Sequence, residues 1–250
     1  MDLKLDSKTA IVTGASTGIG RSIAEHLAAE GVKVLAVARR KELLDEMAAE
    51  VNAKSRGQIV AMQQDILTDH AAKLLSEASK DLLGHTDILI NNAGGSRPLN
   101  IESPESSWDE GHLLNFTCHR RIGHAILPQM IDNKWGRIIS LTGRNEPDVI
   151  NAALAAKVSL HHWSKGISNM MGQHNITSNC IDPGRTLTEQ MRRNWTDEQR
   201  EQFAREQVPV RRYGTPEDIA AVATFLASPL AGYITGVVLR VDGGVHRCDN

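Results

Sequence analysis

The stretch Thr13-Gly14-Ala15-Ser16-Thr17-Gly18-Ile19-Gly20 follows a run of β-branched residues and leads into a helical pattern that continues to about Glu30. Glycines at a strand-to-helix turn allow the backbone to approach a ligand closely, and the amino end of the helix offers unbonded amides and a positive dipole end. Three spaced glycines also fit an ordinary strand-to-helix turn, and only motifs elsewhere in the chain distinguish the two interpretations. The stretch predicts a turn that binds a pyrophosphate.

Short runs rich in β-branched residues alternate with longer helical patterns along the whole chain. The predicted strands are residues 8–13, 32–38, 59–63, 87–91, 137–141, 175–181 and 236–241. Parallel strands need crossover helices, which cover both faces of the sheet and explain why the strands are nearly all apolar. We therefore expect an α/β fold: a Rossmann-type doubly wound parallel sheet of about seven strands, with helices on both faces, in a single domain.

Composition narrows the class of protein. The 250 residues are 41% hydrophobic, enough for one large core, and the net charge of −2 comes with Lys and Arg spread along the chain. No basic face for nucleic acid or for a membrane is expected, so the predicted partner is a small-molecule substrate. Three distant cysteines without a CxxC pair predict neither disulfides nor a metal site, and the charged N-terminus is unlike a signal peptide. A cytoplasmic location is expected.

The stretch from Asp182 to about Gln207 is the most irregular and is rich in charge. Ligands of doubly wound sheets bind at the carboxyl ends of the strands, where this stretch begins. We predict a substrate lid around residues 184–207; an ordinary surface excursion is the alternative.

Further motifs occur in order along the chain. They are Asp65-Ile66, Asn91-Asn92-Ala93-Gly94, Asn115, Gly136-Arg137-Ile138-Ile139, Pro183-Gly184 with Thr188, and Val241-Asp242-Gly243-Gly244. Together with the G-x-x-x-G-x-G spacing of the glycine turn, this set resembles the short-chain dehydrogenase/reductase family across nearly the whole chain. The resemblance implies a nicotinamide dinucleotide cofactor and a carbonyl or alcohol substrate.

The resemblance also assigns residues to roles. The cofactor-binding set is Gly14, Ser16, Thr17, Gly18, Ile19, Gly20, Arg39, Arg40, Asp65, Ile66, Asn91, Ala93, Gly94, Lys157, Pro183, Gly184, Thr186 and Thr188. The catalytic set is Lys157, Asn115 and Thr142. Relatives form dimers or tetramers through two long helices, here near residues 115–130 and 153–171, so a homo-oligomer is expected.

The end of the second predicted strand bears on the choice of cofactor. Family members that use NAD usually carry an acidic residue there, whereas this chain has Ala38 followed by Arg39 and Arg40. A guanidinium can bind a ribose 2′-phosphate bidentately, so NADP(H) is favoured and NAD(H) is the alternative. Thr17, where many NADP-binding relatives carry a basic residue, argues the other way.

The chain departs from the family's proton relay of Tyr, Lys and Ser. Lys157 lies 22 positions before Asn179, the family's interval, but Ala153 stands four residues earlier, where the Tyr is expected. Gly143 falls at the position of the Ser, and Thr142 supplies a hydroxyl only if the backbone shifts. A positioned general acid contributes about 10²–10⁴-fold in rate, so its loss slows hydride transfer without preventing it.

Several substitute groups remain open. Arg144, Asn145, Glu146 and Asp148 follow the fifth predicted strand, and His161 lies one helical turn beyond Lys157. We expect His161 to face away from the strand ends and to pack against the core or a neighbouring subunit. Arg97 either binds an anionic group of the substrate or is simply exposed.

Three classes of function are consistent with these residues. The first is an NADP(H)-dependent oxidoreductase, similar to a 3-oxoacyl reductase, with a non-standard acid/base set. The others are a non-redox enzyme and a catalytically silent NADP(H) sensor on the same fold. The first class alone uses every motif, including Asn115 and Lys157.

Overall fold

The computed structural model describes residues 1–143 and 149–246, and its centre is one parallel sheet. The strands are β1 (Thr9–Thr13), β2 (Lys33–Ala38), β3 (Gln58–Gln63), β4 (Ile88–Asn91), β5 (Gly136–Leu141), β6 (Ile176–Pro183) and β7 (Val238–Val241). Their order in the sheet is β3-β2-β1-β4-β5-β6-β7. Each pairs in parallel with its neighbours, so the predicted doubly wound sheet is confirmed, with strand bounds within about two residues.

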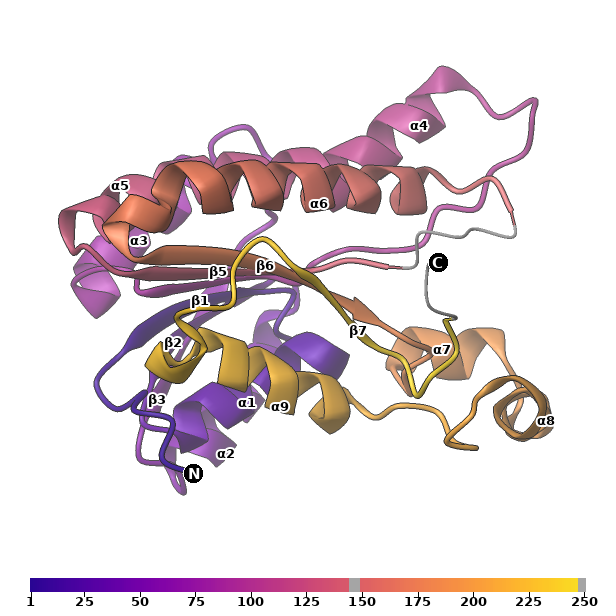
Figure 1. The fold of residues 1–250 in the computed structure, drawn as a ribbon, viewed down its shortest axis with the longest axis horizontal. Coiled ribbons are helices and arrows are strands. Elements are labelled where there is room, and N and C mark those ends of the chain that lie inside the picture. Colours follow the sequence, from indigo (N-terminus) through magenta and orange to yellow (C-terminus); the bar gives the residue numbers. More distant parts are fainter. Residues whose placement is uncertain (144–148, 247–250) are drawn as a thin grey trace.

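Helices cover both faces of the sheet, as the apolar strands require (Figure 1). One face carries α3 (Ala71–Leu83), α4 (Glu105–His112), α5 (Cys118–Asp132) and α6 (Ala152–Met171). The other carries α1 (Gly18–Ala29), α2 (Lys41–Asn52) and α9 (Pro216–Ala227). Short 3₁₀ turns, Gly172–His174 and Pro229–Ala231, follow α6 and α9.

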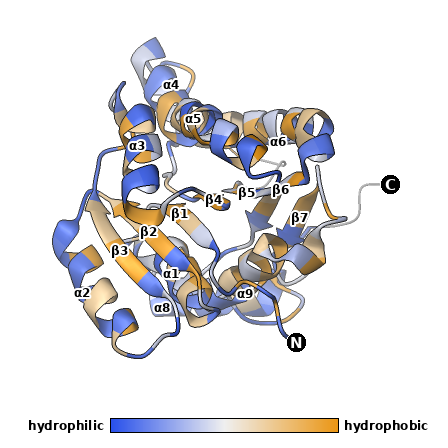
Figure 2. Cartoon of the chain, turned by 90° about the vertical axis from the view of Figure 1, so that its left-hand side faces the viewer, coloured by the Kyte–Doolittle hydropathy of each residue, from blue (hydrophilic) through white to orange (hydrophobic). Residues whose placement is uncertain are grey.

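The strand side chains alternate between two cores, one on each face. In β1, Ala10 and Val12 pack with α1 and α9, whereas Ile11 packs with α3 and α5. All three side chains are fully buried. The apolar colouring of the central strands in Figure 2 reflects this two-sided burial.

The strand order reverses between β1 and β4, because the chain runs outward to β3 before it returns to β4 beside β1. Ligands of such sheets bind at this switch point, at the carboxyl ends of the strands. Two further helices, α7 (Glu189–Asn194) and α8 (Asp197–Gln207), stand at this end of the molecule (Figure 1).

The stretch after β6 is therefore more regular than the sequence predicts. Thr188 caps α7 by accepting a hydrogen bond from the Met191 amide. Thr196 and Gln199 form a capping box at the start of α8. That Thr-x-x-Gln spacing is a signal for a helix start, and the charge content of the segment obscured it.

Candidate functional site

The glycine turn joins β1 to α1 at the switch point of the sheet. Gly14 has a φ of +67°, and a Cβ there would lie 2.8 Å from the Ala93 Cα. A glycine is therefore needed both for the turn and for the close approach of the segment that follows β4. The cap residue of α1, Thr17, makes no side-chain hydrogen bond to the helix amides, so the amino end of α1 is left for an anion.

A threonine hydroxyl ties this turn to the end of β4. Thr13 Oγ1 accepts hydrogen bonds from the amides of Asn92, at 3.0 Å, and Ala93, at 3.2 Å. Asn92 Nδ2 donates to the Thr13 carbonyl at 2.9 Å. Asn91 is buried, and its Nδ2 donates to Ser140 Oγ at 3.3 Å. The predicted pyrophosphate turn and the Asn91–Gly94 motif thus form one unit.

The arginines after β2 lie differently. Within residues 1–143 and 149–246, no hydrogen bond or ion pair of the exposed Arg39 side chain is found. Arg40 reaches across to the glycine turn, where its Nη2 donates to Thr17 Oγ1 at 2.7 Å and to Ser16 Oγ at 3.2 Å. After β3, Ile66 is buried and Asp65 Oδ1 accepts a hydrogen bond from the Leu67 amide.

Asn115 lies in a π-helical turn, Leu113–Thr117, between α4 and α5. Its Oδ1 accepts a hydrogen bond from the Gly95 amide at 3.1 Å, and its Nδ2 donates to the carbonyls of Gly95 and Gly111. A π-helical turn inside a helix is often found at functional sites. The buried Asn115 amide holds the Gly94–Gly95 segment after β4 in place.

Lys157 projects from α6 toward the end of β5, where its Nζ donates to the Thr142 carbonyl at 3.1 Å. Burial lowers the pKa of Lys157, and the nearby Asp182 partly offsets this. Ala153, one turn earlier on the same helix face, is 2% exposed. Thus the methyl group of Ala153 is buried where α6 meets the end of the sheet.

The Thr142 hydroxyl already has two partners. It donates to the Ile181 carbonyl at 3.1 Å, and His161 Nε2 lies 2.9 Å from the same oxygen. The prediction that His161 faces away from the strand ends is wrong. Residues 153, 157 and 161 are spaced by four, so they share one face of α6, and that face lies against the ends of β5 and β6.

Asp182 is a site residue that the sequence reasoning missed. It is 1% exposed, and neither carboxylate oxygen has a hydrogen-bond partner among the described residues. Burial raises its pKa, while His246, Arg240 and Lys157 favour its charged form. The available signal was a lone carboxylate at the end of an otherwise uncharged strand, immediately before Pro183-Gly184.

The segment after β6 folds back onto the glycine turn. Thr186 is buried and donates from Oγ1 to the Gly184 carbonyl at 3.0 Å. A Cβ at Gly18 would lie 3.4 Å from Thr188 Cγ2, so the start of α7 touches the turn. Farther along, the Arg185 guanidinium lies over Trp195, with the Phe203 ring at a similar distance.

Other candidates lie at the rim or outside the described residues. Arg97 forms an ion pair with Glu110, with 2.8 Å between Nη2 and Oε1. Arg144, Asn145, Glu146 and Asp148 fall outside the residues that the structure describes. Within the described ranges, no group of His, Cys, Asp or Glu is arranged to hold a metal ion, and no helix is both long and apolar enough to cross a membrane.

Comparisons with known proteins agree with this geometry. A family profile described as enoyl-(acyl carrier protein) reductase matches residues 14–246. The 7alpha-hydroxysteroid dehydrogenase of Escherichia coli (strain K12) is 32% identical over 246 residues, which cover 97% of this chain and 96% of the relative. The 3-oxoacyl-(acyl-carrier-protein) reductase FabG of Aquifex aeolicus (strain VF5) is 32% identical over 254 residues, 98% of this chain and all of the relative.

Solved structures of dehydrogenases and reductases are also similar to this chain over nearly its whole length. A 7 alpha-hydroxysteroid dehydrogenase complexed with NADH and 7-oxo glycochenodeoxycholic acid superimposes with a TM-score of 0.92 at 32% identity, covering 97% of this chain and 96% of that one. L-sorbose reductase from Gluconobacter frateurii, complexed with NADPH and L-sorbose, has a TM-score of 0.93 at 28% identity and covers 99% and 100%. With its parallel sheet, glycine turn and family motifs in place, the chain belongs to the short-chain dehydrogenase/reductase family of oxidoreductases.

Proposed function

We propose that the protein is an NADP(H)-dependent oxidoreductase that acts on a small carbonyl or alcohol substrate, similar to a 3-oxoacyl reductase. The observation that carries the proposal is the convergence of Asn115 and Lys157 on Gly94. A Cβ at Gly94 would lie 3.0 Å from Asn115 Oδ1 and 3.8 Å from Lys157 Nζ. Two polar side chains thus reach the backbone directly after β4, next to the glycine turn. A non-redox enzyme or a sensor has less need of this nicotinamide-side arrangement.

The residues present fit a dinucleotide. The uncapped amino end of α1 and the close-packed Gly14 suit a pyrophosphate, and Ser16, Thr17 and the arginines after β2 suit the adenosine end. The resemblance to the family assigns the other end of the cofactor to Pro183, Gly184, Thr186 and Thr188, which lie at the end of β6 and directly after it. When bound, the cofactor supplies or accepts a hydride. The chain's own task is to hold it, to orient the substrate and to manage one proton.

That proton needs a donor other than a tyrosine, because Ala153 has no hydroxyl. We assign the acid/base set to Lys157, Asn115 and Thr142. Lys157 and His161 are both titratable groups on the face of α6 that meets the strand ends, but it is Lys157 that also reaches Gly94, and Asp182 stabilises its ammonium form. The Thr142 hydroxyl would have to turn away from the Ile181 carbonyl and His161 to reach a substrate.

The preference for NADP(H) rests on the end of β2. Ala38 offers nothing to a ribose diol, while Arg39 is exposed and available to a 2′-phosphate. We expect NADPH to bind about tenfold or more tightly than NADH in a fluorescence titration, which corresponds to about 1.4 kcal/mol. Arg39→Asp should reverse the preference, since it removes a charge-assisted contact and adds repulsion. Equal affinities for the two cofactors would refute this choice.

Turnover separates the three classes of function. The purified protein is incubated with NADPH and carbonyl compounds of the kinds named for its relatives: a 3-oxoacyl thioester, an oxo-steroid and a ketose. Multiple turnovers of NADPH support the oxidoreductase. Tight binding with a redox-neutral product would favour a non-redox enzyme, and binding without any turnover would favour a sensor.

Two further parts of the proposal concern assembly and access. The segment 184–207, with α7 and α8, acts as a lid over the substrate, since it begins at the strand ends and folds back onto the glycine turn. A homo-oligomer forms through α5 and α6, as expected from the resemblance to the family. Sedimentation of the purified protein tests the second part directly.

A further inference from the structure

The side chain of Arg40 connects three parts of the chain that are far apart in sequence. Its Nη2 donates to Thr17 Oγ1 and Ser16 Oγ in the glycine turn, at 2.7 and 3.2 Å. Its Nη1 donates to Glu189 Oε2 at 3.0 Å. Glu189 is the first residue of α7, 149 positions farther along the chain. The guanidinium therefore bridges the end of β2, the glycine turn and the lid.

The Glu189 carboxylate is held from two sides. Its other oxygen accepts a hydrogen bond from Arg193, one turn along α7, and Thr17 Oγ1 lies 3.5 Å from Glu189 Oε2. The hydrogen bond from Arg40 lowers the pKa of Glu189, with Arg193 and Thr17 acting in the same direction, so the carboxylate is ionised at neutral pH. An anion of the chain itself is thus bound to an arginine that follows β2 and to the turn hydroxyls.

We propose that Glu189 occupies the place of the cofactor's 2′-phosphate, so that α7 is latched to the glycine turn until NADP(H) displaces it. This inference rests on the proposed use of NADP(H), and it adds Arg40 to Arg39 as a partner of the 2′-phosphate. It assigns Glu189 a role in cofactor specificity and makes the lid responsive to the 2′-phosphate group.

The competition follows from charge and from donor count. A phosphate monoester carries a charge of about −1.5 to −2 at pH 7 and three strong acceptor oxygens, so it binds a guanidinium better than one carboxylate does. Two anions at the same guanidinium repel each other, and therefore the phosphate and Glu189 exclude one another. The ribose hydroxyls of NAD(H) carry no charge, so NAD(H) leaves the latch closed.

The latch is weak because both partners are partly exposed: the side chains of Arg40 and Glu189 are 45% and 41% accessible. An exposed ion pair contributes little free energy, so the population of the closed latch exceeds that of the open latch by a factor of about one to five. The latch then weakens NADPH binding by about two- to sixfold, since only the open fraction is competent to bind. This is a modest effect, and a titration can measure it.

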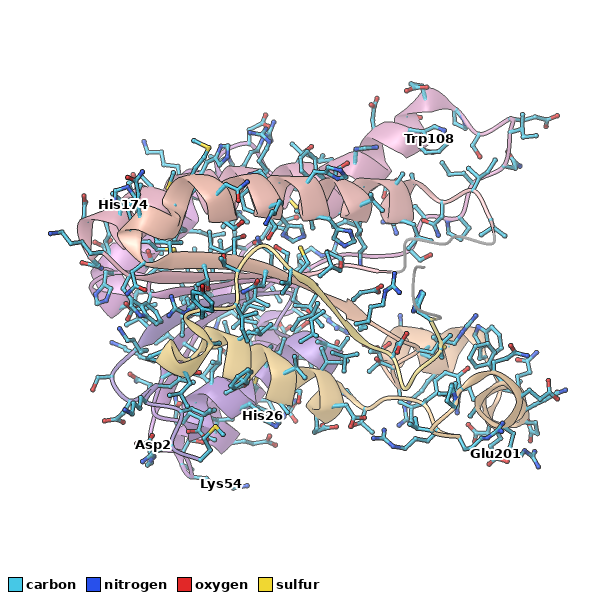
Figure 3. The ribbon with its side chains drawn as sticks, viewed as in Figure 1. Asp2, His26, Lys54, Trp108, His174 and Glu201 are labelled. Carbon is cyan, nitrogen blue, oxygen red and sulfur yellow. The ribbon has the colours of Figure 1, made fainter. Side chains whose placement is uncertain are left out.

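The experiment compares Glu189→Gln with Glu201→Gln in the full chain. Glu201 is an exposed residue on α8 and makes no hydrogen bond or ion pair within the described ranges (Figure 3). Both variants remove one negative charge from the lid, but only the first removes a partner of Arg40. We expect Glu189→Gln to bind NADPH about two- to sixfold more tightly and NADH within twofold of the wild type, with Glu201→Gln unchanged for both. Unchanged or weaker NADPH binding by Glu189→Gln, or an equal gain for both cofactors, would overturn the latch.

Hydrogen exchange of the α7 amides separates the latch from the choice of cofactor. Without cofactor, α7 should exchange faster in Glu189→Gln than in the wild type, and NADPH but not NADH should speed exchange at the wild-type α7 amino end. Faster exchange in the variant supports the latch even if the wild type binds both cofactors equally. Equal exchange in the two proteins overturns the latch, while a measured NADPH preference would leave the proposed function intact.

Discussion

Gly20 lies where the glycine turn enters α1. We expect its replacement by alanine to destabilise the protein and to weaken cofactor binding, because the turn has no room for a methyl group. A Cβ at Gly20 would overlap the Gly14 carbonyl oxygen and Asn92 Nδ2, and it would lie 2.9 Å from the Gly14 carbonyl carbon. The first contact is with backbone, which can yield only if the turn itself moves. The second is with a side chain already bonded to the Thr13 and Gly14 carbonyls.

The expected magnitude has two parts. Overpacking of this kind costs about 1–3 kcal/mol, and the helix propensity of alanine returns about 0.5–1 kcal/mol, so Gly20→Ala should lower the free energy of unfolding by up to about 2.5 kcal/mol. A displaced turn also loses amide contacts to an anion, and each such charged hydrogen bond is worth about 1.5–3 kcal/mol. Cofactor affinity should therefore fall by about tenfold or more.

Gly166 provides a matched control within the chain. It lies inside α6, is exposed, and a Cβ there would meet nothing within 4 Å. Gly166→Ala should raise the free energy of unfolding by about 0.5–1 kcal/mol and leave cofactor binding unchanged. Urea denaturation and NADPH fluorescence titration measure both quantities. A Gly20→Ala protein as stable as the wild type and with unchanged affinity would show that the turn does not approach β4 as described.

Three further results are expected. Lys157→Met should weaken cofactor binding by about 1–3 kcal/mol, the range for a charged hydrogen bond; unchanged affinity with a native circular dichroism spectrum would contradict its role. Ala153→Tyr with Gly143→Ser should raise the rate on an activated ketone by about tenfold or more, because even part of a general-acid effect is of that size; a correctly placed phenol without any gain would argue against an oxidoreductase. His119 is buried in α5, where its Nε2 lies 2.7 Å from the Ala93 carbonyl oxygen. Burial lowers the pKa of His119 to about 4, so the free energy of unfolding keeps its full value above the ordinary pKa of 6.5 and falls as the pH drops from there toward 4. The loss should be up to about 3 kcal/mol in urea titrations, and His119→Leu should flatten that dependence; a variant with the wild-type slope would refute the assignment.

The sheet and the glycine turn could be predicted because their signals are local. The runs of β-branched residues located the seven strands of the sheet, and the signal is clearest in the central strand β1, whose five residues are all buried. The helix starts after β6 were not recognised, although Thr196 and Gln199 have the spacing of a capping box. The many charged residues of that segment favoured an irregular structure in the prediction, and the short capping-box signal was overlooked.

The candidate site was only partly predictable. The motif residues Gly94, Asn115 and Lys157 do converge, because they follow adjacent strands or lie on the helices packed against them. The orientation of His161 was predicted wrongly, since a position on a helix face is fixed only when the rotation of the helix against the sheet is known. No sequence motif indicated the partners of Arg40, or that the Asp182 carboxylate has no hydrogen-bond partner among the described residues.

By itself, the sequence determined the fold class, the position of the glycine turn and the residues at positions 153 and 143, since periodicity, turn chemistry and residue identity are properties of short stretches. The tertiary structure alone decided which polar side chains meet. Arg40 and Glu189 are 149 positions apart, and Thr142 and His161 are 19 apart. A side chain reaches only a few ångströms, so two distant residues meet only where the packing of strands and helices brings them together. That packing cannot be deduced from their separation in the sequence.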